Sequence, residues 1–388
     1  DRRPVGPTVD QHDLSSATQG VSVSSSDAEA ASSPARGFPR SLEAGLARKH
    51  LAGIDGLRAV AALLVVLYHA EVPLIPASTG VLAFFVLSGF LITRLIIAEE
   101  QQTGTVSLSR FYARRSFRIF PAFYAYWLVV MAYMLVRHHP VNWPHSLSAF
   151  FYVSNYYQAI LGDPANGLSH TWSLAIEEQF YLLWPFVFLL LRTNERRFKA
   201  LVVLVPLLWL YRESLIYVFD VNQRYIYEAF DTRVDHILMG CLLAVALEGG
   251  HFKALWRVVC ATPYMMLLTI ALMFLAVSGA TMVHMRDYRD AVEFVVVPVL
   301  CAMLVAQLVA FPASVIASPF NWAWMRFLGK ISYSIYLYQQ FVVYPSMKLF
   351  EGIPVLGVVT AVAASIACAT ASFYLIEQPF LRMRQRYS

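Results

Sequence analysis

Long apolar runs constrain this chain more than any other feature of its sequence. A helix needs about 20 mostly apolar residues to cross the hydrocarbon core of a bilayer. Runs near that length follow one another from residue 51 onward, with short polar segments between them. They cover residues 54–70, 81–98, 119–136, 171–191, 200–219, 234–247, 263–279, 291–311, 327–350 and 354–376. We therefore predict an all-α fold, a polytopic membrane bundle of about ten transmembrane helices.

Composition agrees with a bilayer environment. Of the 388 residues, 58% are hydrophobic and 14% are charged, whereas soluble domains carry about 25% charged residues. One soluble core cannot hide this much apolar surface, so we expect lipid to solvate part of it. The net charge is +5, but the basic residues lie between apolar runs, so we expect no nucleic-acid partner. The four cysteines lack paired spacing, and we predict neither disulfides nor a metal site.

Two segments differ from the apolar runs. Residues 1–48 are small and polar, with Phe38 as their only aromatic residue. We predict a disordered tail there, because such a segment cannot offset its ordering entropy, and we expect no cleavable signal peptide. Residues 147–161 are rich in Tyr and are broken by Ser154 and Asn155. We predict a partial or re-entrant segment there, with an eleventh span as the alternative.

Loop charges predict the orientation. Lys and Arg cluster at residues 48–49, 110–118, 192–199, 253–257 and 382–386. If the chain crosses the membrane about ten times, all of these clusters fall on one side, and basic loops face the cytoplasm. We therefore predict a multi-pass protein with both termini in the cytoplasm. The chain ends twelve residues after Ile376, so we expect no folded domain after the last span.

Ionisable residues inside apolar spans are costly, which makes them candidates for function. Arg58 and His69 lie eleven residues apart on the first span, which is three turns and roughly 16 Å along one helix face. Both would then face one interior cavity, Arg58 near the cytoplasm and His69 near the outer side, where an imidazole suits general-base catalysis. The alternative is that Arg58 reaches lipid headgroups and that His69 is interfacial.

Adjacent carboxylates, Glu177 and Glu178, begin another span. They lie about 100° apart around a helix, so only one of them is expected to face the cavity. A carboxylate beside His69 would orient the imidazole and stabilise its protonated form. The alternative is an anchor near the positive end of the helix dipole.

Basic residues precede the third span. Arg118 lies four residues after Arg114 and three after Arg115, so these side chains are neighbours on a helix face. Guanidinium groups match phosphate oxygens well. The alternative is a plain signal of membrane topology.

A further charged group stands at the outer start of the sixth span. Pairing of Arg233 with Asp231 or Asp235 would make this group a structural ion pair. A role in acceptor binding is the second interpretation.

Six sequence motifs follow one another along the chain. They are IDGLRA at 54–59 leading to His69, FFVLSGFLI at 84–92, RRSFRIFP at 114–121, HTWSLAIEEQFY at 170–181, GKISYSIYL at 329–337 and IEQPF at 376–380. In this order they resemble the motifs of the membrane-bound acyltransferase-3 family, which includes O-antigen and other surface-glycan O-acetylases. The resemblance covers about residues 50–385.

The resemblance implies a membrane O-acyltransferase domain over residues 49–388, in a bacterial inner membrane. It implies acyl-CoA, most often acetyl-CoA, as the donor, and no metal. CoA phosphates would be held by Arg58, Arg114, Arg115 and Arg118. His69, oriented by Glu178 or Glu177, would deprotonate the acceptor hydroxyl directly or would form an acyl-histidine. For a carbohydrate, glycolipid or macrolide-type acceptor, the candidate contacts are His170, Trp172, Ser173, Tyr181, Asp231, Arg233 and Asp235.

This chain departs from the resemblance at one position. Family members often carry a His about two residues after the Ser-Tyr-Ser-x-Tyr-Leu segment, where this chain has Gln339. We interpret this position as a packing or acceptor-side site that varies. Composition also allows a secondary transporter or exporter, but that class favours an internal repeat, and none is visible between the two halves of the sequence.

Overall fold

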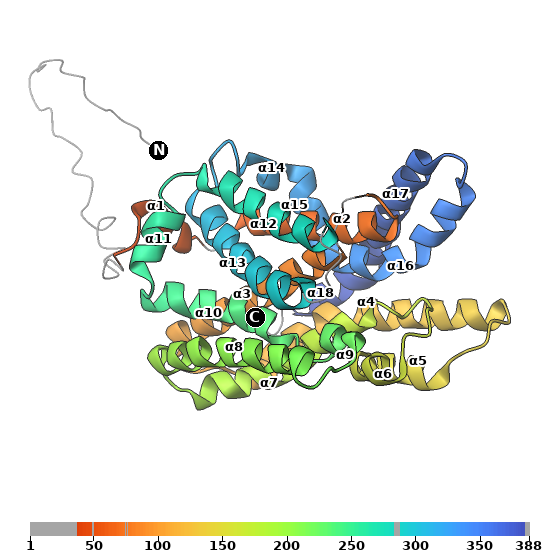
Figure 1. Cartoon of the computed structure of the whole chain (residues 1–388), viewed down its shortest axis with the longest axis horizontal. Coiled ribbons are helices and arrows are strands. Elements are labelled where there is room, and N and C mark those ends of the chain that lie inside the picture. The colour runs from red at the N-terminus through yellow and green to blue at the C-terminus, as the bar shows by residue number, and fades with distance from the viewer. Residues whose placement is uncertain (1–36, 49, 74, 76, 283–287, 385–388) are drawn as a thin grey trace, which may run out of the picture. The chain divides into compact units, whose positions relative to one another are not determined.

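A computed structural model describes residues 37–48, 50–73, 75, 77–282 and 288–384 of the chain (Figure 1). Across these ranges the secondary structure is helical and no strand occurs, as predicted from the apolar runs. The elements are α1 (Arg40–Leu46), α2 (Ala52–His69), α3 (Ala77–Thr103), α4 (Leu108–Val136), α5 (Trp143–Phe150), α6 (Ser154–Leu161), α7 (Thr171–Leu190), α8 (Asn194–Tyr217), α9 (Gln223–Glu228), α10 (Val234–Gly249), α11 (Lys253–Val259), α12 (Met265–Met282), η1 (Tyr288–Glu293), α13 (Phe294–Ala310), α14 (Ser318–Asn321), α15 (Ala323–Lys330), α16 (Ser332–Leu349), α17 (Pro354–Ser372), η2 (Phe373–Glu377) and α18 (Gln378–Arg384).

Seven of the described helices are long and apolar enough to cross a membrane. They are Ala52–His69, Ser78–Thr103, Leu108–Val136, Thr171–Leu190, Asn194–Tyr217, Ala291–Ala310 and Pro354–Met383. The number rises to eight if α10 and α11, which are bent by 106° at their junction, count as one span. The chain is thus a multi-pass helical membrane protein, but the predicted number of about ten spans is not confirmed.

Three of the predicted spans account for the difference between the ten spans predicted and the seven helices found. The run 234–247 forms α10, a helix of only 16 residues. The run 263–279 contributes only the shorter apolar helix Met265–Ser278. The run 327–350 is divided between α15 and α16, and the Ser, Tyr and Gln side chains of α16 lower its hydropathy. The side on which each terminus lies depended on the span number, so it stays a prediction.

The predicted partial segment at residues 147–161 consists of two short helices. α5 and α6 have eight residues each, which corresponds to about 12 Å of helix. Neither can cross a bilayer by itself.

Helix α4 begins at Leu108, eleven residues before the predicted start of the third span at residue 119. The Ser107 side chain accepts a hydrogen bond from the Arg110 backbone N–H at 3.4 Å, and serine is a favoured residue at this capping position. The basic entry segment is therefore helical. This places Arg115 and Arg118 on one face of the helix, as their spacing predicted.

The predicted tail is only partly described. Residues 1–36 lie outside the described residues, whereas residues of the same segment form α1. Leu42 of α1 is fully buried. A Cβ atom at Gly45 would lie 2.0 Å from the Val309 carbonyl oxygen, so α1 contacts the backbone of α13 directly. The domain predicted from residue 49 thus has a further short helix packed onto it.

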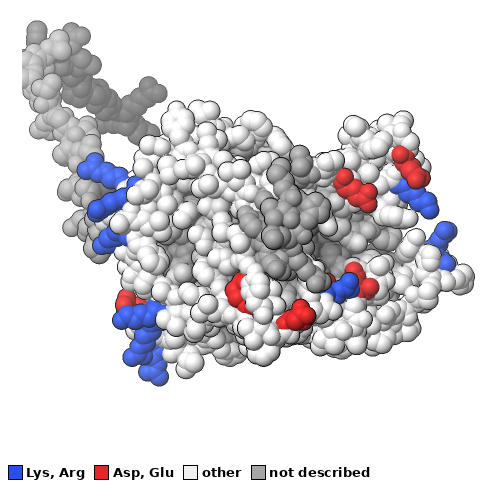
Figure 2. All heavy atoms as spheres, in the orientation of Figure 1, with Lys and Arg blue, Asp and Glu red and all other residues white. Residues whose placement is uncertain are grey.

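Figure 2 shows Lys and Arg side chains at both ends of the visible face, with the larger group on the side where α1 and α11 lie in Figure 1. Helix α11 contributes exposed Lys253 and Arg257. The middle of this face is mostly uncharged. Such a distribution is expected where basic loops meet a membrane surface and apolar helices meet lipid.

Glycines allow the central helices to touch backbone to backbone. A Cβ atom at Gly89 of α3 would lie 1.9 Å from the Ile237 carbonyl oxygen of α10, and one at Gly240 of α10 would lie 2.0 Å from the Val86 carbonyl oxygen. A Cβ atom at Gly329 of α15 would lie 1.9 Å from the Asp55 carbonyl oxygen of α2. Only residues without a side chain permit this approach, which fixes the positions of α2 and α3.

Replacement of Gly89 by Ala is expected to destabilise the protein, because the new methyl group would overlap the α10 backbone; overpacking costs about 1–3 kcal/mol. Thermal unfolding in detergent should show a midpoint several degrees below wild type. Gly352→Ala is the matched control, since no atom lies within 4 Å of its Cβ position. Equal midpoints for the two variants would contradict the close crossing.

Candidate functional site

A cavity of about 70 Å³ lies among α2, α3, α4, α7 and α16. It is lined by Arg58, Val81, Phe84, Phe85, Ser88, Arg115, Arg118, Ile119, Ser173, Leu174, Glu177, Tyr181, Ser332, Tyr333 and Tyr336. All but Val81 belong to the sequence motifs, and five of the six motifs contribute. Segments far apart in the chain therefore converge on one polar cavity within an apolar bundle.

Three of the four arginines predicted to bind CoA line this cavity. Arg58 Nε donates to Ser332 Oγ at 3.3 Å, and Arg118 Nη2 donates to the Lys330 carbonyl oxygen at 3.2 Å. The Arg115 guanidinium carbon lies 3.8 Å from the centre of the Tyr181 ring, in a cation–π contact. Arg58 and Arg118 are thus each hydrogen-bonded to another helix, and Arg115 lies against the Tyr181 ring of α7.

Arg114 is not part of the cavity lining. Its Nη2 atom lies 2.5 Å from Glu99 Oε2, and Arg110 approaches the same carboxylate at 3.5 Å. Consecutive residues point about 100° apart around a helix, so Arg114 and Arg115 take different directions. Arg114 joins α4 to α3 outside the cavity.

The structure distinguishes the two adjacent carboxylates. Glu177 lines the cavity and accepts a hydrogen bond from Ser88 Oγ at 2.7 Å. Glu178 is absent from the lining and has Tyr152 and Tyr333 among its electrostatic neighbours. One of the pair faces the cavity, as the helical geometry predicted, and it is Glu177.

His69 ends α2, and its Nδ1 atom lies 2.9 Å from the Val65 carbonyl oxygen. A carbonyl only accepts hydrogen bonds, so Nδ1 carries a proton, and in the neutral imidazole the lone pair is therefore on Nε2. In the described part of the chain, His69 forms no hydrogen bond or ion pair with Glu177 or Glu178. The Val65 carbonyl therefore orients the imidazole, and the expected orienting carboxylate is not at His69.

The direction of α7 explains why the orienting carboxylate that we expected is not at His69. Glu177 interacts electrostatically with Arg58, and Arg58 lies roughly 16 Å along α2 from His69. At the other end of α7, it is His170 that interacts electrostatically with His69. Helices α2 and α7 thus run in opposite directions here, which places the carboxylate beside Arg58 and a second histidine beside His69.

The remaining residues of the HTWSLAIEEQFY motif divide between the cavity and the core. Ser173 and Tyr181 line the cavity, and Ser173 Oγ lies 2.5 Å from the Tyr336 hydroxyl oxygen. Trp172 instead packs edge-on against Phe85, with 6.4 Å between ring centroids. Ser173 and Tyr181 are among the predicted acceptor contacts. The sequence did not single out the other hydroxyl groups of the lining, because uncharged Ser and Tyr side chains are not unusual in a transmembrane helix; they belong to Ser88, Ser332, Tyr333 and Tyr336.

Comparison with known proteins agrees with this convergence of motifs. The profile of an acyltransferase domain family, acyltransferase-3, matches residues 51–375. The chain belongs to this family. It is therefore an acyltransferase, and the transporter alternative is not supported.

Curated relatives of this acyltransferase are bacterial. The chain is 32% identical over 355 residues to the peptidoglycan O-acetyltransferase OatA of Listeria monocytogenes, covering 86% of this chain and 56% of that protein. It is 30% identical to a putative O-acetyltransferase of Staphylococcus aureus strain COL, with 86% and 57% covered. The O-acetyltransferase OatA of S. aureus strain NCTC 8325 is also 30% identical, with 85% and 57% covered. The chain thus spans little more than half the length of these relatives, and no solved structure matches it.

The charged group at the start of α10 lies outside the acyltransferase cavity. Asp235 Oδ2 lies 2.8 Å from Arg212 Nη1, and both side chains are fully buried. Trp209 Nε1 donates to the same oxygen at 3.0 Å. The Arg233 guanidinium carbon lies 4.0 Å from the centre of the Phe294 ring. Asp235 thus takes part in buried ion pairs with Arg212 and with His236, whose Nδ1 atom lies 3.0 Å from Asp235 Oδ1. Arg212 is a lone arginine in the apolar run 200–219 and was not among the predicted site residues.

Asp231 has a different environment from Asp235. Its carboxylate accepts hydrogen bonds from the Tyr156, Tyr211 and Tyr225 hydroxyl groups at 2.8–3.2 Å. Burial, together with the Asp231 charge, raises the pKa of Tyr156. These bonds tie α6, α8 and α9 together beside the start of α10.

Gln339 is fully buried. Ile335 and Val343, four residues before and after it, belong to the same core cluster as Ala62 and Val66 of α2. Residues spaced by four share a helix face, so Gln339 lies on the face of α16 that packs toward α2.

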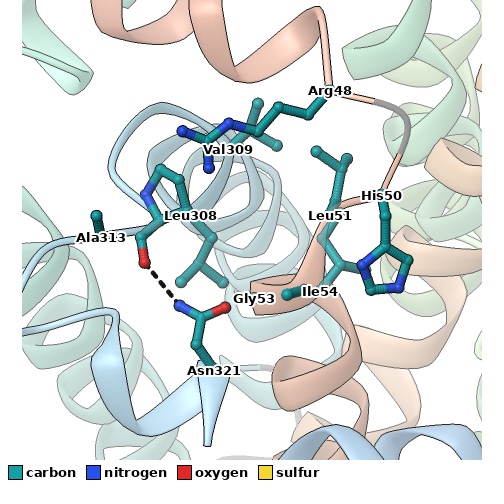
Figure 3. Close-up of a pocket in the computed structure, with 11 residues that line it drawn as sticks. Arg48, His50, Leu51, Gly53, Ile54, Leu308, Val309, Ala313 and Asn321 are labelled. Carbon is teal, nitrogen blue, oxygen red and sulfur yellow. Dashed lines mark hydrogen bonds between the residues drawn. The ribbon is translucent and has the colours of Figure 1, made fainter.

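A second pocket, of about 170 Å³, lies between the start of α2 and the end of α13 (Figure 3). Arg48 extends over Val309, and Asn321 Nδ2 donates to the Pro312 carbonyl oxygen at 2.7 Å. None of the candidate site residues lines this pocket. The motif-lined cavity is therefore the candidate active site.

Loss of one partner of the buried pair should be strongly destabilising. In Arg212→Met the buried Asp235 carboxylate loses its guanidinium partner and keeps only His236 as an ion-pair partner, and breaking such a buried pair costs roughly 3–5 kcal/mol. The double variant Arg212→Met/Asp235→Leu should recover most of the loss in thermal unfolding experiments. The control is Lys199→Met on the same helix, which removes an exposed pair with Glu195 and should change the unfolding midpoint little. A double variant as unstable as the single one would refute this account.

Proposed function

We propose that this chain transfers an acyl group, as acetyl, from acyl-CoA to a carbohydrate hydroxyl on the opposite side of the bacterial inner membrane. Acyl-CoA enters from the cytoplasmic side, where the basic loops and both termini lie. The acceptor arrives at the end of α2 that carries His69. One relative is named a peptidoglycan O-acetyltransferase, which supports a cell-wall glycan as the acceptor class.

The observation that carries this proposal is the convergence of Arg58, Arg115 and Arg118 on one cavity inside the bundle. Guanidinium groups within a membrane domain are costly, and three of them line this cavity together with Glu177. Asp55, Glu178 and Glu377 lie behind the lining and interact electrostatically with Arg58, Arg115 and Arg118, respectively. The oxygens of CoA phosphate groups match the guanidinium geometry.

His69 is the proposed general base. Its Nδ1–H is held by the Val65 carbonyl, so Nε2 can take the proton of the acceptor hydroxyl. The hydroxyl oxygen then attacks the thioester carbon, the carbon–sulfur bond breaks, and the proton passes to the departing thiolate. In the covalent variant, Nε2 itself receives the acyl group before the acceptor does.

Glu177 has a different role in this proposal from the one that its sequence position predicted. Its carboxylate bonds Ser88 and interacts electrostatically with Arg58 and Arg115. It therefore positions the guanidinium groups and limits their mutual repulsion in the absence of CoA. Glu178, beside the tyrosines of α4 and α16, supports the wall behind it.

His69→Ala is expected to abolish transfer, since a general base contributes roughly 10²–10⁴-fold to the rate. Membranes that contain the protein would be incubated with radiolabelled acetyl-CoA and a bacterial cell extract, and label in the glycan fraction would be measured. His138→Ala, in an exposed loop, should behave as wild type. Full transfer by His69→Ala would exclude both the base and the acyl-histidine.

Arg118→Gln is expected to raise KM for acetyl-CoA with little change in kcat. A hydrogen bond to a charged group contributes roughly 1.5–3 kcal/mol, which is about a tenfold to hundredfold effect. Arg110→Gln is the matched control, because Arg110 is on the same helix but pairs with Glu99 outside the cavity. With S-acetylpantetheine, a donor without phosphates, the two variants should be equal. If Arg118→Gln keeps the wild-type KM, Arg118 does not hold a CoA phosphate.

A further inference from the structure

His170 is a buried imidazole whose ring nitrogens make no regular hydrogen bond to the residues that the structure describes. Only 4% of the residue is exposed. Neither ring nitrogen makes a hydrogen bond of normal geometry, although the Leu337 backbone interacts with the ring. Buried polar atoms are almost always satisfied in folded proteins, and an exception calls for an explanation. A group from a bound substrate is one explanation.

The ring of His170 is held in place without the use of its nitrogens. The Tyr126 and Tyr336 rings contact it edge-on, with centroid separations of 5.5 Å and 5.4 Å. The Tyr336 hydroxyl donates to the backbone carbonyl oxygen of His170 at 3.0 Å, not to its side chain. The fold therefore confines this residue mainly through its shape and its backbone, and the Leu337 backbone accounts for only one of its two ring nitrogens.

His170 interacts with residues of both parts of the proposed site. Tyr336 and Ser173, which contact one another, both line the cavity that contains Arg58, Arg115 and Arg118, and the Tyr336 ring contacts His170, so His170 lies behind the cavity wall. It also interacts electrostatically with His69. In the proposed function the thioester extends from this cavity toward His69, which brings its carbonyl group to the neighbourhood of His170.

We propose that His170 is a second catalytic histidine, whose ring N–H donates a hydrogen bond to the acyl carbonyl oxygen while His69 acts on the acceptor hydroxyl. This inference rests on the proposed function. His69 takes the hydroxyl proton, the new carbon–oxygen bond forms, and the carbonyl oxygen becomes an oxyanion that His170 stabilises. The oxyanion then collapses, the carbon–sulfur bond breaks, and the proton held by His69 goes to the thiolate.

His170→Phe is the decisive variant, because a phenyl ring keeps the contacts with Tyr126 and Tyr336 and leaves the backbone hydrogen bond intact. Its unfolding midpoint in detergent should be at or above that of wild type. Its kcat, measured as thiol release from acetyl-CoA in the presence of cell extract, should fall roughly 100-fold or more, with KM for acetyl-CoA nearly unchanged. A stable His170→Phe that keeps most of the wild-type kcat would overturn the proposal.

A second pair of variants covers the case in which the phenyl ring is not tolerated. His170→Gln keeps an N–H donor and should retain much more kcat than His170→Leu, which has none. Equal kcat values for these two variants would overturn the assignment whatever their stability. Suppose that wild type turns over acetyl-CoA and that His69→Ala does not. Equal kcat values for His170→Gln and His170→Leu would then contradict the role of His170 and leave the proposed function standing. If wild type does not turn over acetyl-CoA, the proposed function itself fails, and this inference fails with it.

Discussion

Charged side chains inside a lipid-solvated bundle must find their partners within the protein, because no water is present to solvate them. Arg212 pairs with Asp235 between α8 and α10. Arg197 donates to both carboxylate oxygens of Glu100, at 2.6 Å and 2.7 Å, and so joins α8 to α3. These pairs determine which helices can be neighbours. In the candidate active site, Glu177 interacts electrostatically with Arg58 and Arg115, and Glu377 interacts with Arg118.

Close backbone contacts give the cavity its shape. Gly89 and Gly240 let α3 touch α10, and Gly329 lets α15 touch α2. With α2 and α3 held in this way, side chains from five motifs face one space. The polar groups then separate along the antiparallel pair α2 and α7, with guanidinium groups and Glu177 at one end and two histidines at the other. A transfer reaction with donor and acceptor on opposite sides requires such a separation.

The two histidines of the proposed mechanism differ in how local their environments are. His69 is oriented by Val65, four residues before it on its own helix. His170 is confined by Tyr126 and Tyr336, which are far from it in the chain. The first arrangement follows from helix geometry, whereas the second depends on how α4, α7 and α16 meet.

The sequence by itself determined the helical membrane architecture, the family and the motifs that supply the cavity lining, because hydrophobic run length, residue spacing and ordered motifs are local properties. It also determined that one of two adjacent carboxylates would face the cavity. Only the tertiary structure decided that this carboxylate is Glu177, that it lies beside Arg58 and not beside His69, that Arg114 lies outside the cavity, and that Asp235 pairs with Arg212. The physical reason is that these side chains find their partners on helices that are distant in the chain. The direction of those helices and the closeness of their packing depend on the whole bundle and not on any single segment.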